Sequence, residues 1–235
     1  ADFSPAELEQ TNIICIPLKV LFGGEEYEEN INLSKDQFYE KLLAFDGFPK
    51  TSQAAPAVLA GLFEEAKAEG DEIIYFTLSS ALSGTWQSAM FIKEDMGYDK
   101  AFVVDSRNAT GGQRLLVEYA AKLRDEGKSA AEILTALEDV RERIVLFACI
   151  DTLEYLYKGG RISHTVYKLG TLANIKPIIT VEQDGIDPSL LFDDGHVYFM
   201  SNGTDDNGEG GVVQCEIDIT TGKFEVTEFQ NENIL

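Results

Sequence analysis

Basic residues are scarce in this chain of 235 residues, which carries 19 Lys and Arg against 41 Asp and Glu. The formal net charge of -22 excludes the basic surface that nucleic-acid backbones and anionic membrane surfaces require, so neither is an expected partner. A run of about 18 apolar residues and a charged-then-apolar leader are also missing, so we expect no membrane span and no signal peptide. Any anionic ligand must therefore be held by local donors.

Cysteine is equally rare. Cys15, Cys149 and Cys215 are widely spaced and form no CxxC pair, which argues against a disulfide framework or a zinc site and favours a cytoplasmic protein. Cys15 and Cys149 fall within apolar runs typical of strands, where we expect them to be buried as small apolar residues. We expect neither a metal ion nor a cofactor.

One stretch does carry chemistry: a turn rich in small hydroxyl residues between an apolar strand at 72–77 and a helix that begins near residue 85. It contains Ser79, Ser80, Ser83 and Gly84. Such a turn offers unpaired N–H groups, hydroxyls and the positive end of the helix dipole to an anion. It predicts half of an anion-binding site; the alternative is that Ser83 merely caps the helix.

Apolar strands alternate with helices through most of the chain, and this order predicts an α/β fold with a mostly parallel sheet covered by helices. We expect a strand at 12–20, with Pro17 at an edge or bend, and a hydroxyl-rich loop at 49–56. Ligands of such sheets bind beyond the carboxyl ends of the strands, so the turns at 77–85 and 105–112 are expected to converge. A Gly-Gly-Arg turn at 159–161 supplies Arg161 as a fixed cation, unless it pairs with an acidic neighbour.

Four motifs occur in order: residues 50–53 (KTSQ), 82–89 (LSGTWQSA), 155–163 (YLYKGGRIS) and 174–177 (NIKP). Together they resemble the DegV family of bacterial fatty-acid-binding proteins, over about residues 1–184. The resemblance implies two α/β lobes that hold one long-chain fatty acid in an apolar tunnel and present its carboxylate to a partner fatty acid kinase, which makes an acyl phosphate. It implies a carrier, not an enzyme. By match to the motifs, the fatty-acid-binding residues are Thr51, Ser52, Ser83, Gly84, Arg161 and Ile162: Thr51 or Ser52 and Ser83 donate to the carboxylate, and Arg161 organises the head-group end.

Two departures from the family pattern accompany this resemblance. The family's first strand and its Asp-Ser-Thr turn should precede Ala1, and the sequence changes in kind near Gly185. We therefore expect a DegV-like region at 1–184 and a β-rich segment at 185–235, joined as a natural fusion, as an assembly artefact or from separate sources.

The segment at 185–235 has 11 acidic residues and one basic residue, and its hairpin signals at 194–195, 202–203 and 221–222 predict short antiparallel strands. It resembles part of a blade of glycoside hydrolase family 43, a β-propeller family, with Asp187 matching the aspartate that tunes the catalytic acid there. This gives an alternative function, a β-xylosidase- or arabinofuranosidase-like fragment, although no residues match that chemistry's acid and base. A phosphate-binding α/β enzyme is a third reading.

Overall fold

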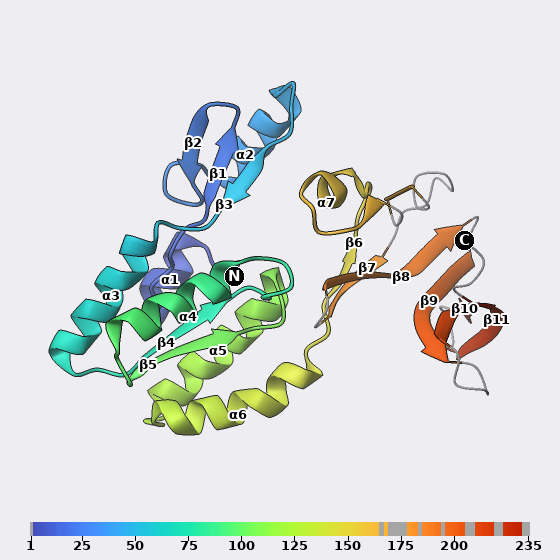
Figure 1. The fold of residues 1–235 in the computed structure, drawn as a ribbon. Helices are drawn as coiled ribbons and strands as arrows, with labels where there is room; N and C mark the ends of the chain where they lie inside the picture. The colour runs from blue at the N-terminus through green and yellow to red at the C-terminus, as the bar shows by residue number, and fades with distance from the viewer. Residues whose placement is uncertain are drawn as a thin grey trace. The chain divides into compact units, whose positions relative to one another are not determined.

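A computed structural model describes residues 2–164, 167–168, 178–182, 185–193, 196–204, 210–218 and 223–231, with side chains described up to Val181 except at Cys149 and Ile178. The chain forms two compact units, Ala1–Leu146 and Phe147–Leu235. Helices and strands alternate through the first unit, and the second is mainly strands (Figure 1). The predicted α/β class is confirmed. Among the described strands, however, only β4 and β5 pair in parallel.

The first unit is organised around β4 (Ile73–Thr77) and β5 (Ala101–Asp105), which have helices packed on both faces. Ile73 and Tyr75 pack against a core formed by α3 (Pro56–Glu69) and α4 (Thr85–Met96), where Phe63 is fully buried. The intervening residues Ile74 and Phe76 pack against α5 (Thr110–Asp125) and α6 (Ala130–Arg143). Because successive strand residues point to opposite faces, the apolar run of β4 serves both helix layers.

Local sequence signals fix where several helices begin and end. Ser4 caps α1 (Pro5–Thr11) and Ser129 caps α6, each in a reciprocal pair with the glutamate three residues later, and this Ser-x-x-Glu spacing by itself predicts the start of a helix. Gly70 ends α3 in the left-handed conformation at φ 78°, which glycine adopts more readily than other residues, so its place in the sequence predicts this helix end.

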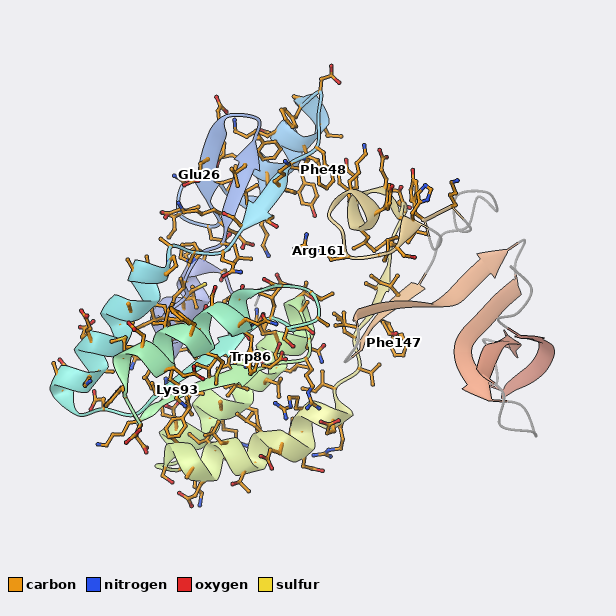
Figure 2. The ribbon with its side chains drawn as sticks, in the orientation of Figure 1. Glu26, Phe48, Trp86, Lys93, Phe147 and Arg161 are labelled. Atoms are coloured by element: carbon orange, nitrogen blue, oxygen red, sulfur yellow. The ribbon has the colours of Figure 1, made fainter. Side chains whose placement is uncertain are left out.

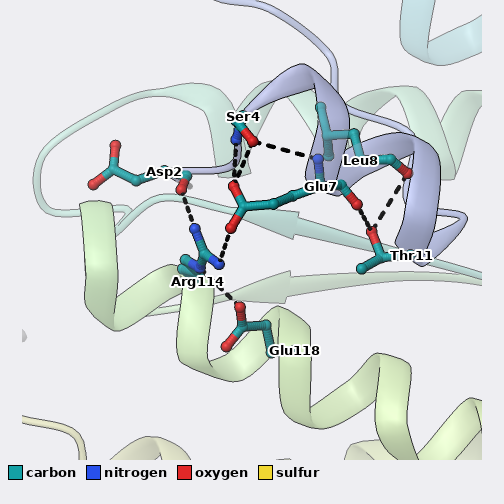
Figure 3. Close-up of polar contacts among 7 residues, drawn as sticks. All are labelled: Asp2, Ser4, Glu7, Leu8, Thr11, Arg114 and Glu118. Carbon is teal, nitrogen blue, oxygen red and sulfur yellow. Dashed lines mark hydrogen bonds and ion pairs between the residues drawn. The ribbon is translucent and has the colours of Figure 1, made fainter.

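Arg114 fixes helix α1 against α5 (Figure 3). Its guanidinium donates to Glu7 Oε1 at 2.6 Å, to the carbonyl of Asp2 at 2.6 Å and to Glu118 at 2.8 Å. The Arg114 hydrogen bond, supported by Ser4, lowers the pKa of Glu7 from 4.5 to about 2. Near the other end of α5, Arg124 donates to the carbonyls of Thr11 and Asn12 at 2.9 and 3.0 Å. Helix α1 therefore runs in the same direction as α5.

A small antiparallel sheet of order β2-β1-β3 completes the first unit: β1 (Lys19–Phe22), β2 (Glu25–Glu28) and β3 (Lys50–Ser52). Phe22 packs beneath α2 (Lys35–Ala44), with ring centroids 5.8 Å from Phe38 and 5.4 Å from Phe45. Two predictions are wrong here. The strand expected at 12–20 begins only at Lys19, because 13–17 has no strand partner among the described residues, and the loop expected at 49–56 contains the edge strand β3.

The second unit contains α7 (Glu154–Lys158) and an antiparallel sheet of order β11-β10-β9-β8-β7-β6. Its strands are β6 (Phe147–Cys149), β7 (Ile178–Glu182), β8 (Gly185–Asp193), β9 (His196–Thr204), β10 (Gly210–Asp218) and β11 (Lys223–Asn231). The antiparallel pairing predicted for the tail is confirmed.

Of the three hairpin signals in the tail, 202–203 lies inside β9 and is wrong, because the pairing with β10 continues through it. The signals at 194–195 and 221–222 lie outside the described residues, as does the motif at 174–177. The predicted division near Gly185 stays a prediction; β7 and β8 pair across it, with Glu182 opposite Gly185. Among the described helices, none combines the length and apolar character needed to cross a bilayer.

Candidate functional site

The candidate site centres on the turn between β4 and α4, where the chain leaves the sheet at Thr77 and enters the helix at Thr85. Gly84 is the N-cap residue of α4 and has no side chain with which to cap it. Ser83 partly supplies what Gly84 lacks: its half-buried hydroxyl accepts from the Thr85 N–H at 3.3 Å and contacts the Thr85 hydroxyl at 2.8 Å. The alternative that Ser83 serves as the N-cap residue is therefore wrong: Gly84 takes that position without a side-chain cap, and the Ser83 hydroxyl bonds the N–H and the hydroxyl of Thr85.

This paired arrangement suits an anion. The positive end of the α4 dipole and the first helical N–H groups lie beside the two hydroxyls of Ser83 and Thr85. The first turn of α4 contains no acidic residue, so nothing within it competes for those donors. Trp86, the only tryptophan of the chain, stands in the same turn of the helix (Figure 2).

Strand β3 delivers the second pair of predicted residues. Thr51 pairs with Val20 of β1 and Ser52 with Lys19, and both Thr51 and Ser52 are exposed. The segment continues into Gln53, whose Nε2 lies only 2.8 Å from where a Cβ on Gly84 would stand. The structure therefore brings the end of the KTSQ motif against the Ser83–Gly84 turn. Any side chain at position 84 would collide with the Gln53 amide, so glycine at this position leaves room for Gln53.

Sequence reasoning gave Gln53 no role of its own. Its position in the same four-residue motif as Thr51 and Ser52 was the available signal, but its contact with Gly84 joins two motifs that are far apart in the chain.

The turn after β5 supports the turn after β4, as predicted. Asp105 Oδ1 accepts from the Ser80 N–H at 3.1 Å and from the Arg107 N–H at 2.9 Å. The carbonyl of Asn108 accepts from the Ser79 N–H at 2.7 Å. The expected convergence of the two turns at the carboxyl ends of the strands is confirmed.

Buried polar side chains lie beneath these two turns. Thr77, Ser79, Ser106 and Asn108 are each at most 2% exposed. Asn108 Nδ2 donates to the Ile144 carbonyl at 3.2 Å, whereas Asn108 Oδ1 has no hydrogen-bond partner among the described residues. Buried polar groups of this kind hold a turn in one geometry, because each alternative leaves donors or acceptors unpaired.

A cavity of about 590 Å³ lies in the same unit, next to β4. Thr77, Leu78 and Thr85 line it together with the apolar residues of β4, α3 and α5, but Thr51, Ser52, Ser83 and Gly84 do not. Cys15 also lines it and is exposed, so the prediction that this cysteine is buried is wrong. Cys15 is exposed because its segment, 13–17, has no strand beside it among the described residues.

The remaining predicted residues belong to the second unit. Arg161, labelled in Figure 2, follows α7. Gly160, at φ 76°, turns the chain there, and the Arg161 N–H donates to the Leu156 carbonyl at 2.8 Å. The exposed Arg161 guanidinium also donates to the carbonyl of Gly159, and the neighbouring Ile162 is buried at 9% exposure. Gly159 has no room for a side chain, because a Cβ there would stand 2.9 Å from the Tyr155 carbonyl oxygen. The turn thus presents Arg161 from a fixed backbone.

Metal chemistry finds no support in the part of the chain that the structure describes. No cluster of three or more His, Cys, Asp or Glu residues there is arranged to hold a metal ion. The side chain of Asp187, in β8, lies outside the described residues, as does that of His196.

The fold and this turn define an α/β protein in which a hydroxyl-rich turn links strand β4 to helix α4, with the end of a second hydroxyl-rich motif lying against it. Comparison with known proteins gives the family: the family model described as "Uncharacterised protein, DegV family" matches residues 1–189, and the chain belongs to this family.

Two curated relatives are DegV domain-containing proteins. The one from Caldanaerobacter subterraneus is 36% identical over 179 residues, which cover 76% of this chain and 64% of the relative. The one from Staphylococcus aureus is 33% identical over 226 residues, covering 96% of this chain and 76% of the relative.

Solved structures agree with this assignment. A DegV family protein from Thermus thermophilus, described as binding fatty acid, matches with a TM-score of 0.70 at 31% identity, covering 79% of this chain and 66% of that one. DegV from Bacillus subtilis, described as a fatty acid binding protein, matches with a TM-score of 0.68 at 34% identity, covering 78% and 66%. This chain thus spans about two thirds of the length of these structures and of the Caldanaerobacter relative.

Proposed function

We propose that this chain binds a long-chain fatty acid and holds its carboxylate at the Ser83–Thr85 turn. The observation that carries the proposal is the pair of hydroxyls on Ser83 and Thr85, 2.8 Å apart at the start of α4, in a chain whose matched structures include fatty-acid-binding DegV proteins. Thr51 or Ser52 is proposed as a further carboxylate donor, because Gln53 brings their motif against Gly84.

Local hydrogen-bond donors must hold the carboxylate, because the net charge of the chain repels anions. At a formal charge of -22 the overall field opposes a carboxylate, so the attraction comes from hydroxyl and N–H groups within hydrogen-bond distance. Hydrogen bonds to an ionised acceptor are stronger than those between neutral groups, which lets a few hydroxyls and amides hold a carboxylate without a lysine.

The proposal extends to a role as a cytoplasmic bacterial carrier that presents the carboxylate to a fatty acid kinase. Arg161 is assigned to the head-group end and Ile162 to the fatty-acid-binding residues, supported by their match to the YLYKGGRIS motif and by the fixed backbone at Gly159 and Gly160. The kinase partnership rests on the family resemblance. It is tested by adding kinase and ATP to the fatty-acid-loaded chain and assaying acyl phosphate, which should form only when both proteins are present.

Replacing Ser83 by alanine tests the carboxylate site directly. Leaving a bound polar group without its partner costs about 1–3 kcal/mol, so the affinity for oleate should fall roughly 5- to 150-fold. The affinity is measured by titrating the chain with oleate, once with Trp86 fluorescence as the signal and once by isothermal titration calorimetry.

Ser129→Ala is the matched control, because Ser129 is the N-cap serine of α6 and lies outside the proposed site. It should leave oleate affinity unchanged while lowering helix stability. Equal affinities for the wild-type chain and the Ser83→Ala variant would remove Ser83 from the site.

A further inference from the structure

The side-chain amide of Gln53 lies at the hydroxyl turn before α4 without a partner of its own. Its Nε2 stands 2.8 Å from where a Cβ on Gly84 would be, which places the amide beside the N-cap residue of the helix. Among the described residues, none forms a hydrogen bond with this amide. Gln53 is half-buried, so water reaches the amide from one side only. Two N–H donors are therefore held at the turn and remain available to a ligand.

The hydroxyls of Ser83 and Thr85 cannot by themselves pair both oxygens of a carboxylate. Each hydroxyl carries one hydrogen, and one of these two hydrogens is used in the bond of 2.8 Å between Ser83 Oγ and Thr85 Oγ1. The pair therefore has one hydrogen left to donate to a ligand. Because a carboxylate has two oxygens with about four acceptor positions, most of these positions stay free for other donors.

Glycine at position 84 lets the Gln53 amide come this close to the helix start. A Cβ there would stand 2.8 Å from Gln53 Nε2, which is shorter than van der Waals contact, so the flexible Gln53 side chain would have to move away. The first turn of α4 also contains no acidic residue that could accept from the amide. Both features leave the amide at the helix start, where the helix dipole favours a negatively charged group.

We infer that Gln53 is a specificity-determining residue of the proposed site, with its amide donating to one oxygen of the ligand carboxylate while the Ser83–Thr85 pair donates to the other. This inference rests on the proposed function and specifies which head group the site accepts. A fatty alcohol has only one oxygen, so it leaves either the amide or the hydroxyl pair unpaired. A site built for a hydrogen bond rejects a ligand that lacks the matching group, so Gln53 makes the site select a fatty acid over the alcohol of the same chain length.

Three substitutions of Gln53 test this role by titration with oleate. Gln53→Ala removes the donors and should weaken oleate binding by about 5-fold or more, since a hydrogen bond to a charged acceptor is lost. Gln53→Glu keeps the shape but replaces the donors with a negative charge, so it should weaken binding more than Gln53→Ala does. Gln53→Lys changes the shape but keeps a donor, so its affinity should stay within about 3-fold of the wild-type chain. A role in packing alone predicts the opposite order, with Gln53→Glu tolerated best.

A second ligand and a second position separate hydrogen-bond donation from folding. Oleyl alcohol should bind the wild-type chain and the Gln53→Ala variant equally well, because the hydroxyl pair can still serve its single oxygen. Gly84→Ala displaces the amide without removing it, so it should also weaken oleate binding but add little in a Gln53→Ala background. Gln10→Glu, at an exposed position of α1, is the matched control for the added charge and should leave oleate affinity unchanged.

Two results would overturn the inference: unchanged oleate affinity in Gln53→Ala and Gln53→Glu, or losses of affinity that are equal for oleate and oleyl alcohol. If Ser83→Ala still weakens oleate binding in that case, the proposed carboxylate turn stands and only the role of Gln53 fails. A wild-type chain that binds no oleate would remove the proposed function and this inference together. A loss confined to oleate, largest for Gln53→Glu and smallest for Gln53→Lys, supports the inference.

Discussion

Replacing Gly112 by alanine is expected to destabilise the first unit, although alanine is the better helix former. Gly112 lies buried in the first turn of α5, and a Cβ there would press on Asn108 Oδ1 and stand 2.6 Å from Asn108 Cγ. Asn108 is 2% exposed and is held by its bond to the Ile144 carbonyl, so its amide has little room to move.

The magnitude follows from two opposed effects. Glycine to alanine in a helix gains up to about 1 kcal/mol in propensity. Forcing a methyl group into a filled site costs about 1–3 kcal/mol. If the Asn108 amide instead rotates away and loses its hydrogen bond to the Ile144 carbonyl, the cost is about 0.5–1.5 kcal/mol. Set against the propensity gain, the steric cost leaves a net loss of up to about 2 kcal/mol in the free energy of unfolding of the first unit.

Urea denaturation measures this change, with Trp86 fluorescence as the probe because the only tryptophan lies in the first unit. Gly61→Ala is the matched control: Gly61 lies inside α3 with nothing within 4 Å of a built Cβ, so alanine should stabilise by about 0.5–1 kcal/mol. Equal gains from Gly112→Ala and Gly61→Ala would refute the steric reasoning. In an Asn108→Ala background, Gly112→Ala should destabilise less than it does in the wild-type chain, because the clashing amide is then absent.

Two further predictions concern the core and the N-terminal helix. Phe63→Ala should lower the free energy of unfolding by about 3–5 kcal/mol, because Phe63 is fully buried, whereas Phe91→Ala, at a 71% exposed site, should change it by less than about 0.5 kcal/mol in the same urea assay. The carboxylate of Glu7 has its pKa lowered to about 2, so its ionised form stabilises the fold above about pH 4.5 and this contribution is lost as the pH falls towards 2. Glu7→Gln should therefore be less stable than the wild-type chain at neutral pH, and the difference in denaturation midpoint should shrink on acidification; a difference that stays constant down to pH 2 would contradict the Glu7–Arg114 pairing as its cause.

Sequence patterns predicted the features that depend on near neighbours in the chain. The capping pairs at Ser4 and Ser129, the stop at Gly70 and the hydroxyl turn before α4 are all decided within a few residues, and all are present. The α/β class follows in the same way from the order of apolar strands and helices.

Features that depend on distant partners were the ones missed. An apolar run such as 12–20 predicts a strand only if a neighbouring strand pairs with it, and only Lys19 onward finds one among the described residues. The exposure of Cys15 has the same cause. Thr51 and Ser52 lie in a strand instead of a loop because β1 reaches them, a contact that no local pattern encodes. Likewise, the approach of Gln53 to Gly84 joins two motifs whose separate spacings say nothing about each other.

The carboxylate of Asp105 couples the two turns at the carboxyl end of the sheet. It binds the Ser80 N–H from one turn and the Arg107 N–H from its own, while the Asp105 carbonyl accepts from Arg141 of α6 at 3.1 Å. Neither turn can open without breaking bonds to the same residue, so the two should open as one cooperative unit in the native state. An anion that orders the Ser83 turn would therefore also reduce the motion of the β5–α5 turn and of the end of α6. Binding would thus affect helices that the anion does not contact.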